Sequence, residues 1–134
     1  MGIKAHVRIL PFIMLTVLAG CATSGVTTPA PRAMSTATQS ELDAMAELRT
    51  TYSAGRYGDV IREVSRSNIL AQAPMDIRIE SMKLQAFSYC LTKHRVLCED
   101  QFRRMLKVDP NFELASAERG HPQWQPAFDA ARQH

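Results

Sequence analysis

Helical periodicity is the feature that most limits what this chain can fold into. Between residues 41 and 134, apolar residues recur three or four positions apart, and no convincing stretch alternates with a period of two. The first pattern is typical of amphipathic helices, whereas the second indicates half-buried strands. The sequence therefore predicts an all-helical (all-α) domain over residues 41–134.

Interruptions in the pattern divide this region into helices. Ser40 precedes the acidic Glu41, which favours a helix start because the hydroxyl can cap the first turn. Gly55 then interrupts the first helical stretch, a connector follows over residues 68–74, and another break falls at residues 92–94. We expect four helices arranged as two hairpins.

The fourth helix should end at Asp109-Pro110, because proline cannot continue the helical hydrogen bonding. A loop then leads to a short final helix over residues 123–132, which carries Trp124 and Phe128 four positions apart. These two aromatic side chains should share one helical face and cap the open end of the second hairpin.

The first twenty residues have the layout of a secretory signal peptide. Lys4 and Arg8 give a positive start, an apolar run occupies residues 9–18, and small residues follow. The run is too short to span a bilayer as a permanent helix. We interpret residues 1–20 as a cleaved signal peptide.

The motif Leu18-Ala19-Gly20-Cys21 resembles the lipobox of bacterial lipoproteins, in which the cysteine is lipidated and becomes the first mature residue. The alternative is an ordinary signal peptide with an incidental cysteine. The resemblance implies a covalent lipid at Cys21 and no other cofactor. Acyl chains anchor a domain without a membrane-spanning helix, at roughly 0.8 kcal/mol per buried methylene. Because Ala22 rather than aspartate follows, the resemblance implies the periplasmic face of the outer membrane.

Residues 22–40 are rich in Thr, Ser, Ala and Pro and contain one charged residue and no aromatic. This composition is typical of a flexible tether. The predicted organisation is therefore a signal peptide over residues 1–20, a lipidated cysteine and linker over residues 21–40, and a helical domain over residues 41–134.

Length and charge exclude several classes of function. A chain of 134 residues allows one small domain rather than a multidomain enzyme. Of the 16 Lys and Arg residues, Lys4 and Arg8 lie in the signal peptide, which leaves 14 against 13 Asp and Glu. That balance is too even for nucleic-acid binding through phosphate neutralisation. The sequence also contains no phosphate-binding glycine loop, paired zinc motif or serine elbow, so we expect no enzyme.

The second hairpin resembles the tetratricopeptide repeat. Its matching residues, at the large, small, aromatic and proline positions of the repeat, are Met82, Ala86, Tyr89, Cys98, Phe102, Met105 and Pro110. The first hairpin matches less well, at Tyr52, Gly55, Tyr57 and Val60. The resemblance covers roughly residues 41–112 and implies two stacked helical hairpins with a C-terminal capping helix. The alternative is a generic four-helix arrangement.

The C-terminal segment resembles small tetratricopeptide lipoproteins found with bacterial envelope machines, particularly the type VI secretion apparatus. The motif residues are Asp109, Pro110, Phe112, Leu114, Glu118, Gly120, His121, Pro122, Trp124, Pro126 and Phe128. The resemblance implies partners among envelope proteins, secretion-apparatus components included. We expect Trp124, the only tryptophan, to be a core residue rather than an exposed recognition residue.

Apart from Cys21, the chain contains Cys90 and Cys98, an even pair for an oxidising compartment. Flanking a hairpin turn, their α-carbons could approach within the roughly 4.4–6.8 Å that a disulfide needs. A disulfide and a pair of small packing residues both remain open. On one uninterrupted helix, Cys90, His94 and Cys98 would share a face and could bind a soft metal, although no fourth ligand is apparent and a turn is predicted at His94.

Two further groups of polar residues have structural readings. His121 lies in a loop, where we expect a hydrogen bond rather than catalysis, because no nucleophile or paired carboxylate stands at a recognisable spacing. Glu99-Asp100 and Arg103-Arg104 are spaced for charge pairing four residues apart. Such pairs are typical of a solvated helix face.

These features together predict a non-enzymatic, lipid-anchored periplasmic scaffold or adaptor that binds another envelope protein. By resemblance, it would be accessory to a type VI secretion system. A pilotin-like or outer-membrane-assembly accessory lipoprotein is the alternative within this class. A metal-binding or redox lipoprotein using Cys90, His94 and Cys98 is the alternative of another class. The oligomeric state stays open, because two repeats and a cap can also be completed by self-association.

Overall fold

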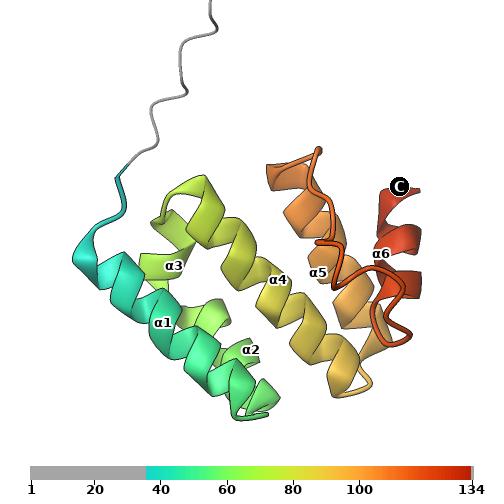
Figure 1. The fold of residues 1–134 in the computed structure, drawn as a ribbon, viewed down its shortest axis with the longest axis horizontal. Coiled ribbons are helices and arrows are strands. Elements are labelled where there is room, and N and C mark those ends of the chain that lie inside the picture. The colour runs from blue at the N-terminus through green and yellow to red at the C-terminus, as the bar shows by residue number, and fades with distance from the viewer. Residues whose placement is uncertain (1–35, 134) are drawn as a thin grey trace, which may run out of the picture. The chain divides into compact units, whose positions relative to one another are not determined.

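The computed structural model describes residues 36–133, which form six helices and no strand (Figure 1). The helices are α1 (Gln39–Ser53), α2 (Tyr57–Arg66), α3 (Asn68–Gln72), α4 (Met75–Leu91), α5 (Arg95–Val108) and α6 (Gln125–Arg132). The all-helical class that the sequence predicts is confirmed. The predicted signal peptide, the lipidation residue Cys21 and most of the linker lie outside the described residues.

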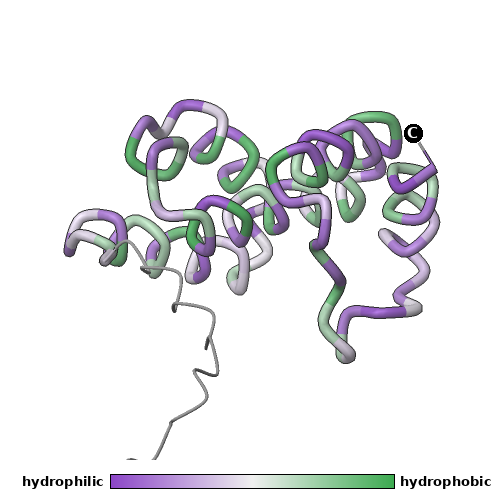
Figure 2. Tube along the Cα trace, turned by 90° about the horizontal axis from the view of Figure 1, so that it is seen from above, coloured by the Kyte–Doolittle hydropathy of each residue, from purple (hydrophilic) through white to green (hydrophobic). Residues whose placement is uncertain are grey.

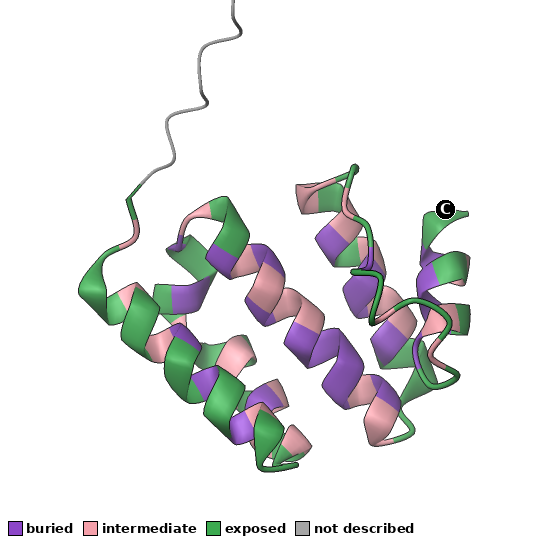
Figure 3. Cartoon of the chain, viewed as in Figure 1, coloured by how far each residue is buried: buried purple, intermediate pink, exposed green. Residues whose placement is uncertain are grey.

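Helix α4 is the central element of the domain. The first three helices pack on one side of it, α5 packs on the other, and α6 packs against α5 (Figure 1). Nine of the 17 residues of α4 are buried, which explains why its sequence is apolar over more than one face (Figure 3). Within residues 36–133, no helix combines the length and the apolar character that crossing a membrane requires.

Helix α1 begins earlier than the sequence predicts. Its cap is Thr38 rather than Ser40, because the Thr38 side chain accepts a hydrogen bond from the Glu41 backbone N–H and the Glu41 carboxylate accepts one from the Thr38 N–H at 2.7 Å. This reciprocal pair is a capping box, and Glu41 stands at the position from which it reaches back to Thr38. Ala37 also packs against the core, so the folded domain begins before residue 41.

The turn between α1 and α2 uses Gly55 as the sequence predicts. Gly55 has a φ of 73°, in the left-handed region that glycine adopts without a steric penalty. Tyr52 and Tyr57 flank the turn with their ring centroids 5.4 Å apart in an edge-on arrangement. Val60, in the next turn of α2, is completely buried.

The segment expected to be a connector contains the short helix α3. Ser67 caps this helix by accepting a hydrogen bond from the Leu70 N–H at 3.2 Å, and the Leu70 side chain is buried. Periodicity could not reveal α3, because five residues span little more than one helical turn. Pro74 then precedes the first residue of α4, where a missing N–H costs nothing.

Buried apolar side chains form two clusters. What we call the N-terminal core consists of Met45, Leu48, Val60, Leu70, Ala73, Ile77 and Leu84. What we call the C-terminal core consists of Ile79, Ala86, Phe87, Cys90, Cys98, Phe102, Met105, Leu114, Trp124, Ala127, Phe128 and Ala131. Tyr52 packs against both cores. Figure 2 shows the matching pattern, in which hydrophobic and hydrophilic residues alternate within single helical turns.

Candidate binding surfaces

The turn between α4 and α5 is closed by a disulfide bond between Cys90 and Cys98. Their α-carbons lie 5.2 Å apart, and both residues are buried. The chain reverses through Lys93, whose φ is 64°, and the His94 N–H donates to the Tyr89 carbonyl oxygen at 2.8 Å. The disulfide therefore fastens the two helices where the hairpin turns.

The metal-binding alternative required one uninterrupted helix from Cys90 to Cys98. Instead, α4 ends at Leu91 and α5 begins at Arg95. The disulfide also takes both sulfur atoms out of use as thiolate ligands, and their burial shields them from attack by another thiol. Within the described range, no group of three His, Cys, Asp or Glu side chains is placed to hold a metal ion.

The residues matched to the tetratricopeptide repeat fall into three groups. Those with no exposed surface are Val60, Ala86, Cys98, Phe102 and Met105. Those that are partly buried are Tyr52, Tyr57, Met82 and Tyr89. Gly55 and Pro110 are exposed. These two residues stand at repeat positions but do not pack within the repeat: Gly55 forms the turn between α1 and α2, and Pro110 follows Asp109, which caps α5, so its effect is to end the helix.

Trp124 and Phe128 close the C-terminal core. The Trp124 indole stacks on the Phe87 ring of α4 with centroids 4.1 Å apart, and its Nε1 donates to the Glu118 carbonyl oxygen at 2.9 Å. Phe128 meets Phe102 edge-on with centroids 5.2 Å apart. Trp124 is therefore a core residue whose one polar group is paired, rather than an exposed recognition residue.

The segment between α5 and α6 covers one face of α4. Lys83 of α4 pairs with Glu118 at 2.6 Å, and both side chains are about four-fifths buried. His121 stacks on Trp124 with centroids 3.5 Å apart, and its Nδ1 accepts from the Gln123 N–H at 3.2 Å. Glu118 and Trp124 of this segment therefore occupy the face of α4 that bears Lys83 and Phe87. Any partner of α4 has to approach from another side.

The charged residues of α5 pair along the helix. Arg103 contacts Glu99 at 2.7 Å and Asp100 at 3.3 Å, and Arg104 also pairs with Asp100. About a third of the Arg103 side chain is exposed, and Arg104 is more exposed still. Exposed pairs of this kind contribute little to stability, so they give the helix a solvated face.

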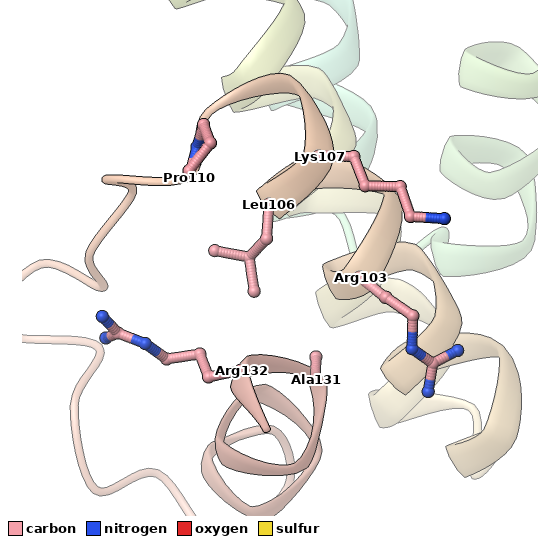
Figure 4. A pocket seen from close by; sticks show the side chains of 6 residues that line it. All are labelled: Arg103, Leu106, Lys107, Pro110, Ala131 and Arg132. Atoms are coloured by element: carbon pink, nitrogen blue, oxygen red, sulfur yellow. The ribbon is translucent and has the colours of Figure 1, made fainter. Parts of the chain in front are cut away.

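A first surface, the C-terminal hollow, lies between α5 and α6 and has a volume of about 320 Å³. Its lining residues are Arg103, Leu106, Lys107, Pro110, Ala131 and Arg132. In Figure 4, Leu106 points between Arg132 on one side and Arg103 on the other. Arg132 pairs with Glu113 at 2.7 Å and Arg103 with Glu99, so two of the three positive charges already have partners.

A second surface, the interhelix groove, joins the two halves of the domain. It has a volume of about 350 Å³, with α2 and α3 contributing one side, α5 the other, and α4 the residues between them. Its lining residues are Val64, Ser65, Leu70, Ala71, Arg78, Ser81, Met82, Gln85, Tyr89, Gln101 and Arg104. None of these described residues is acidic; of the two arginines, Arg104 is paired with Asp100 and Arg78 with no carboxylate of the described residues, so Arg78 makes the groove favour a negatively charged group.

Most polar groups in the interhelix groove are hydrogen-bonded within the chain. Gln85 Nε2 donates to the Ile61 carbonyl oxygen at 3.0 Å and to Ser65 Oγ at 2.8 Å. Ser81 Oγ donates to the Arg78 carbonyl oxygen at 2.8 Å. The two bonds of Gln85 join α4 to α2, and the bond of Ser81 lies within α4.

Two side chains of the groove, Gln101 and Arg78, take no part in these bonds. Gln101 is only 5% exposed and its amide makes no hydrogen bond with any residue between 36 and 133, but the amide atoms are not fully buried and can reach water. The Arg78 Nε is the one fully buried side-chain nitrogen or oxygen of the described residues that has no hydrogen-bond partner there. Sequence reasoning missed both residues. The available signal was Gln101 itself, a polar residue beside Cys98 and Phe102 on the apolar face of a helix.

Burial shifts the pKa of a tyrosine between the two halves. Tyr52 is half-buried, and this burial, with smaller contributions from Tyr57 and Glu118, raises its pKa to about 12 from the ordinary 10.0. On α1, the hydrogen bond from Arg49 to Glu80 raises the pKa of Arg49. Neither residue lines the interhelix groove. The Arg49–Glu80 pair joins α1 to α4 at an exposed site, and Tyr52 stays neutral until strongly alkaline pH.

The fold, the C-terminal hollow and the interhelix groove are described above from the residues of this chain alone. No family model matches the chain, and neither a curated protein nor a solved structure matches it.

Proposed function

We propose that this protein is a lipid-anchored periplasmic adaptor. Cys21 would attach the chain to the outer membrane through its lipid, and the helical domain would bind another envelope protein. The observation that supports this function best is the interhelix groove, which is lined by the amide of Gln101 and the guanidinium of Arg78, neither of which is paired with a polar side chain of the described residues. A partner in the groove would bond to the accessible atoms of these groups in place of water.

An anchor makes a modest binding surface effective. A domain tethered to the membrane meets membrane-bound partners at a much higher local concentration than a free one. The residues between 22 and 40, rich in Thr, Ser, Ala and Pro, support a spacer role for this part of the chain. The domain can then work as a scaffold without catalysing a reaction.

The machine that the adaptor serves is proposed from resemblance. The C-terminal segment, with Gly120-His121-Pro122 and Trp124 among its motif residues, resembles lipoproteins of the type VI secretion apparatus. A pilotin-like or outer-membrane-assembly accessory role is the competing proposal. In the domain itself this segment covers α4 and completes the C-terminal core, which is a structural role.

Crosslinking in intact envelopes tests the adaptor function. A photo-crosslinking residue at Ala71, on the exposed rim of the interhelix groove, should yield a discrete product with one envelope protein. The matched control is the same residue at Ala117, which is also exposed but lies outside the groove. The Cys21→Ser chain should leave the membrane fraction and lose most of the Ala71 product.

Two results would overturn the proposal. The first is an Ala71 product no stronger than the Ala117 product, because the groove would then have no partner. The second is an unchanged Ala71 product in the released Cys21→Ser chain, because the anchor would then make no contribution to binding.

A further inference from the structure

We infer that the interhelix groove binds an extended segment of the partner that carries an acidic side chain. Gln101 would pair with the backbone of that segment, and Arg78 would pair with its carboxylate. This inference rests on the proposed adaptor function and names the part of the partner that the domain holds.

Gln101 supplies the first argument. Its neighbours on the same face of α5, Cys98 and Phe102, are completely buried, and an apolar residue would suit this position. The amide atoms of Gln101 are not fully buried, so in the free domain they bond to water in the groove, and a ligand replaces that water. A primary amide carries both donors and an acceptor, which match the C=O and N–H of one peptide unit. An extended backbone segment in the groove would therefore satisfy Gln101.

Arg78 supplies the second argument. Its Nε is buried without a partner, and its Nη2 contacts the Met75 Sδ at 3.7 Å. Arg78 makes no ion pair within the described chain, and the other described arginines without one, Arg56, Arg66, Arg95 and Arg119, do not line the groove. Arg104 also lines the groove, but Asp100 neutralises it. Arg78 therefore offers its terminal guanidinium nitrogens, rather than the buried Nε, to a carboxylate in the groove.

The donors and acceptors of the groove favour an extended segment. The groove has a volume of about 350 Å³ and lies between α2 and α3 on one side and α5 on the other. The peptide groups of a helix are already bonded to one another, whereas those of an extended segment are free to pair with Gln101. The apolar side chains of Val64, Leu70 and Met82 line the same groove and can contact the non-acidic residues of the segment.

The test uses the full chain, purified from envelopes in detergent, and a displayed library of random ten-residue peptides. Peptides selected by the wild-type chain should be enriched in Asp and Glu. A synthetic representative should bind at least tenfold more weakly when its acidic residue is replaced by the corresponding amide. The same peptide should bind at least tenfold more weakly to Arg78→Met and to Gln101→Leu.

Three controls make the comparison specific. Lys107→Met removes one positive charge at the C-terminal hollow and should leave the affinity within twofold of wild type. Ala71→Trp blocks the rim of the groove without altering a buried residue, and it should reduce binding even if Gln101→Leu disturbs the fold. Circular dichroism melts establish that each variant is folded.

Several outcomes would contradict the inference. The selected peptides could lack an enrichment in Asp and Glu. The peptide could bind Arg78→Met as tightly as wild type, or it could bind Lys107→Met more weakly instead. Vesicles containing phosphatidylglycerol that bind the wild-type chain through Arg78, while no peptide does, would assign the groove to a lipid. If Ala71 crosslinks to an envelope protein equally in wild type and Arg78→Met, the inference fails and the adaptor function stands. If acidic peptides bind but Ala71 forms no crosslink in envelopes, the adaptor function fails, whereas the inference that the groove binds an acidic segment is supported.

Discussion

The N-terminal and C-terminal cores reach burial by different means. The N-terminal core has seven buried residues, all aliphatic or methionine, whereas the C-terminal core contains four aromatic side chains and a disulfide. Phe87 contacts both Phe102 and Trp124, and Phe102 in turn contacts Phe128. A core with several ring contacts and a covalent link should open less readily than a smaller aliphatic core. We therefore expect α1–α3 to unfold locally before α5–α6.

This difference has a consequence for the interhelix groove. Leu70 lies in the N-terminal core, whereas Gln101 stands on α5 beside residues of the C-terminal core, and both line the groove. A ligand that contacts both sides would hold the less stable half against the more stable one. Partner binding should therefore slow hydrogen exchange in α2 and α3 more than in α5.

The largest expected effect is in the C-terminal core. Phe102→Ala should lower the free energy of unfolding by about 3–5 kcal/mol, because it removes a completely buried ring that contacts Phe87 and Phe128. Urea unfolding followed by circular dichroism measures this change. A loss under about 1 kcal/mol would mean that the aromatic contacts do not hold this half together.

A matched substitution in the other half sharpens the contrast. Leu48→Ala, at a completely buried site of the N-terminal core, should cost about 2–5 kcal/mol and speed hydrogen exchange mainly in α1–α3. Equal acceleration in α5 and α6 would show that the two halves unfold as one unit.

The disulfide is the next largest contribution. Replacing both Cys90 and Cys98 with alanine should cost about 2–3 kcal/mol through greater freedom of the unfolded chain, with their separation of 8 residues setting the loop. Thermal melts of the double variant and of reduced wild type should agree in direction. If neither shows a lower Tm, the bridge is not what stabilises the α4–α5 turn.

A smaller effect is expected where α1 begins. Thr38→Ala removes the hydroxyl that accepts from the Glu41 N–H, which should cost about 1 kcal/mol. Exchange should accelerate in the first turn of α1 while the C-terminal half keeps its protection. Ser40→Ala is the control, because Ser40 is not the cap, and a larger loss in this variant would contradict the assigned helix start.

The smallest effect concerns alkaline pH. Because the pKa of Tyr52 is raised to about 12 in the folded chain, the unfolded chain loses its proton first as the pH rises above 10, so stability falls between these values. Solvent screening of a half-exposed ring keeps the effect to a fraction of 1.4 kcal/mol per pH unit, an order-of-magnitude bound. Tyr52→Phe should flatten the pH dependence of urea midpoints measured from pH 10 upward, towards pH 12. If the urea midpoints of wild type and Tyr52→Phe fall equally with pH, the raised pKa of Tyr52 is contradicted.

The fold was largely predictable because its signals are local. Periodicity, Gly55 and Pro110 place five helices close to where they lie. The helix α3 was missed because one turn carries no period, and the Thr38 cap was missed because two hydroxyl residues compete near the same start. The groove could not be predicted, since whether Gln101 and Arg78 find partners depends on how α2 and α5 lie across α4.

The account depends most on the covalent anchor at Cys21, because an adaptor needs to be held where its partner is. Intact mass spectrometry of the chain purified from envelopes tests this directly. The account predicts a mature chain that begins at Cys21 and carries a diacylglycerol thioether and an amide-linked acyl chain. An unmodified Cys21, or a chain that keeps residues 1–20, would contradict it.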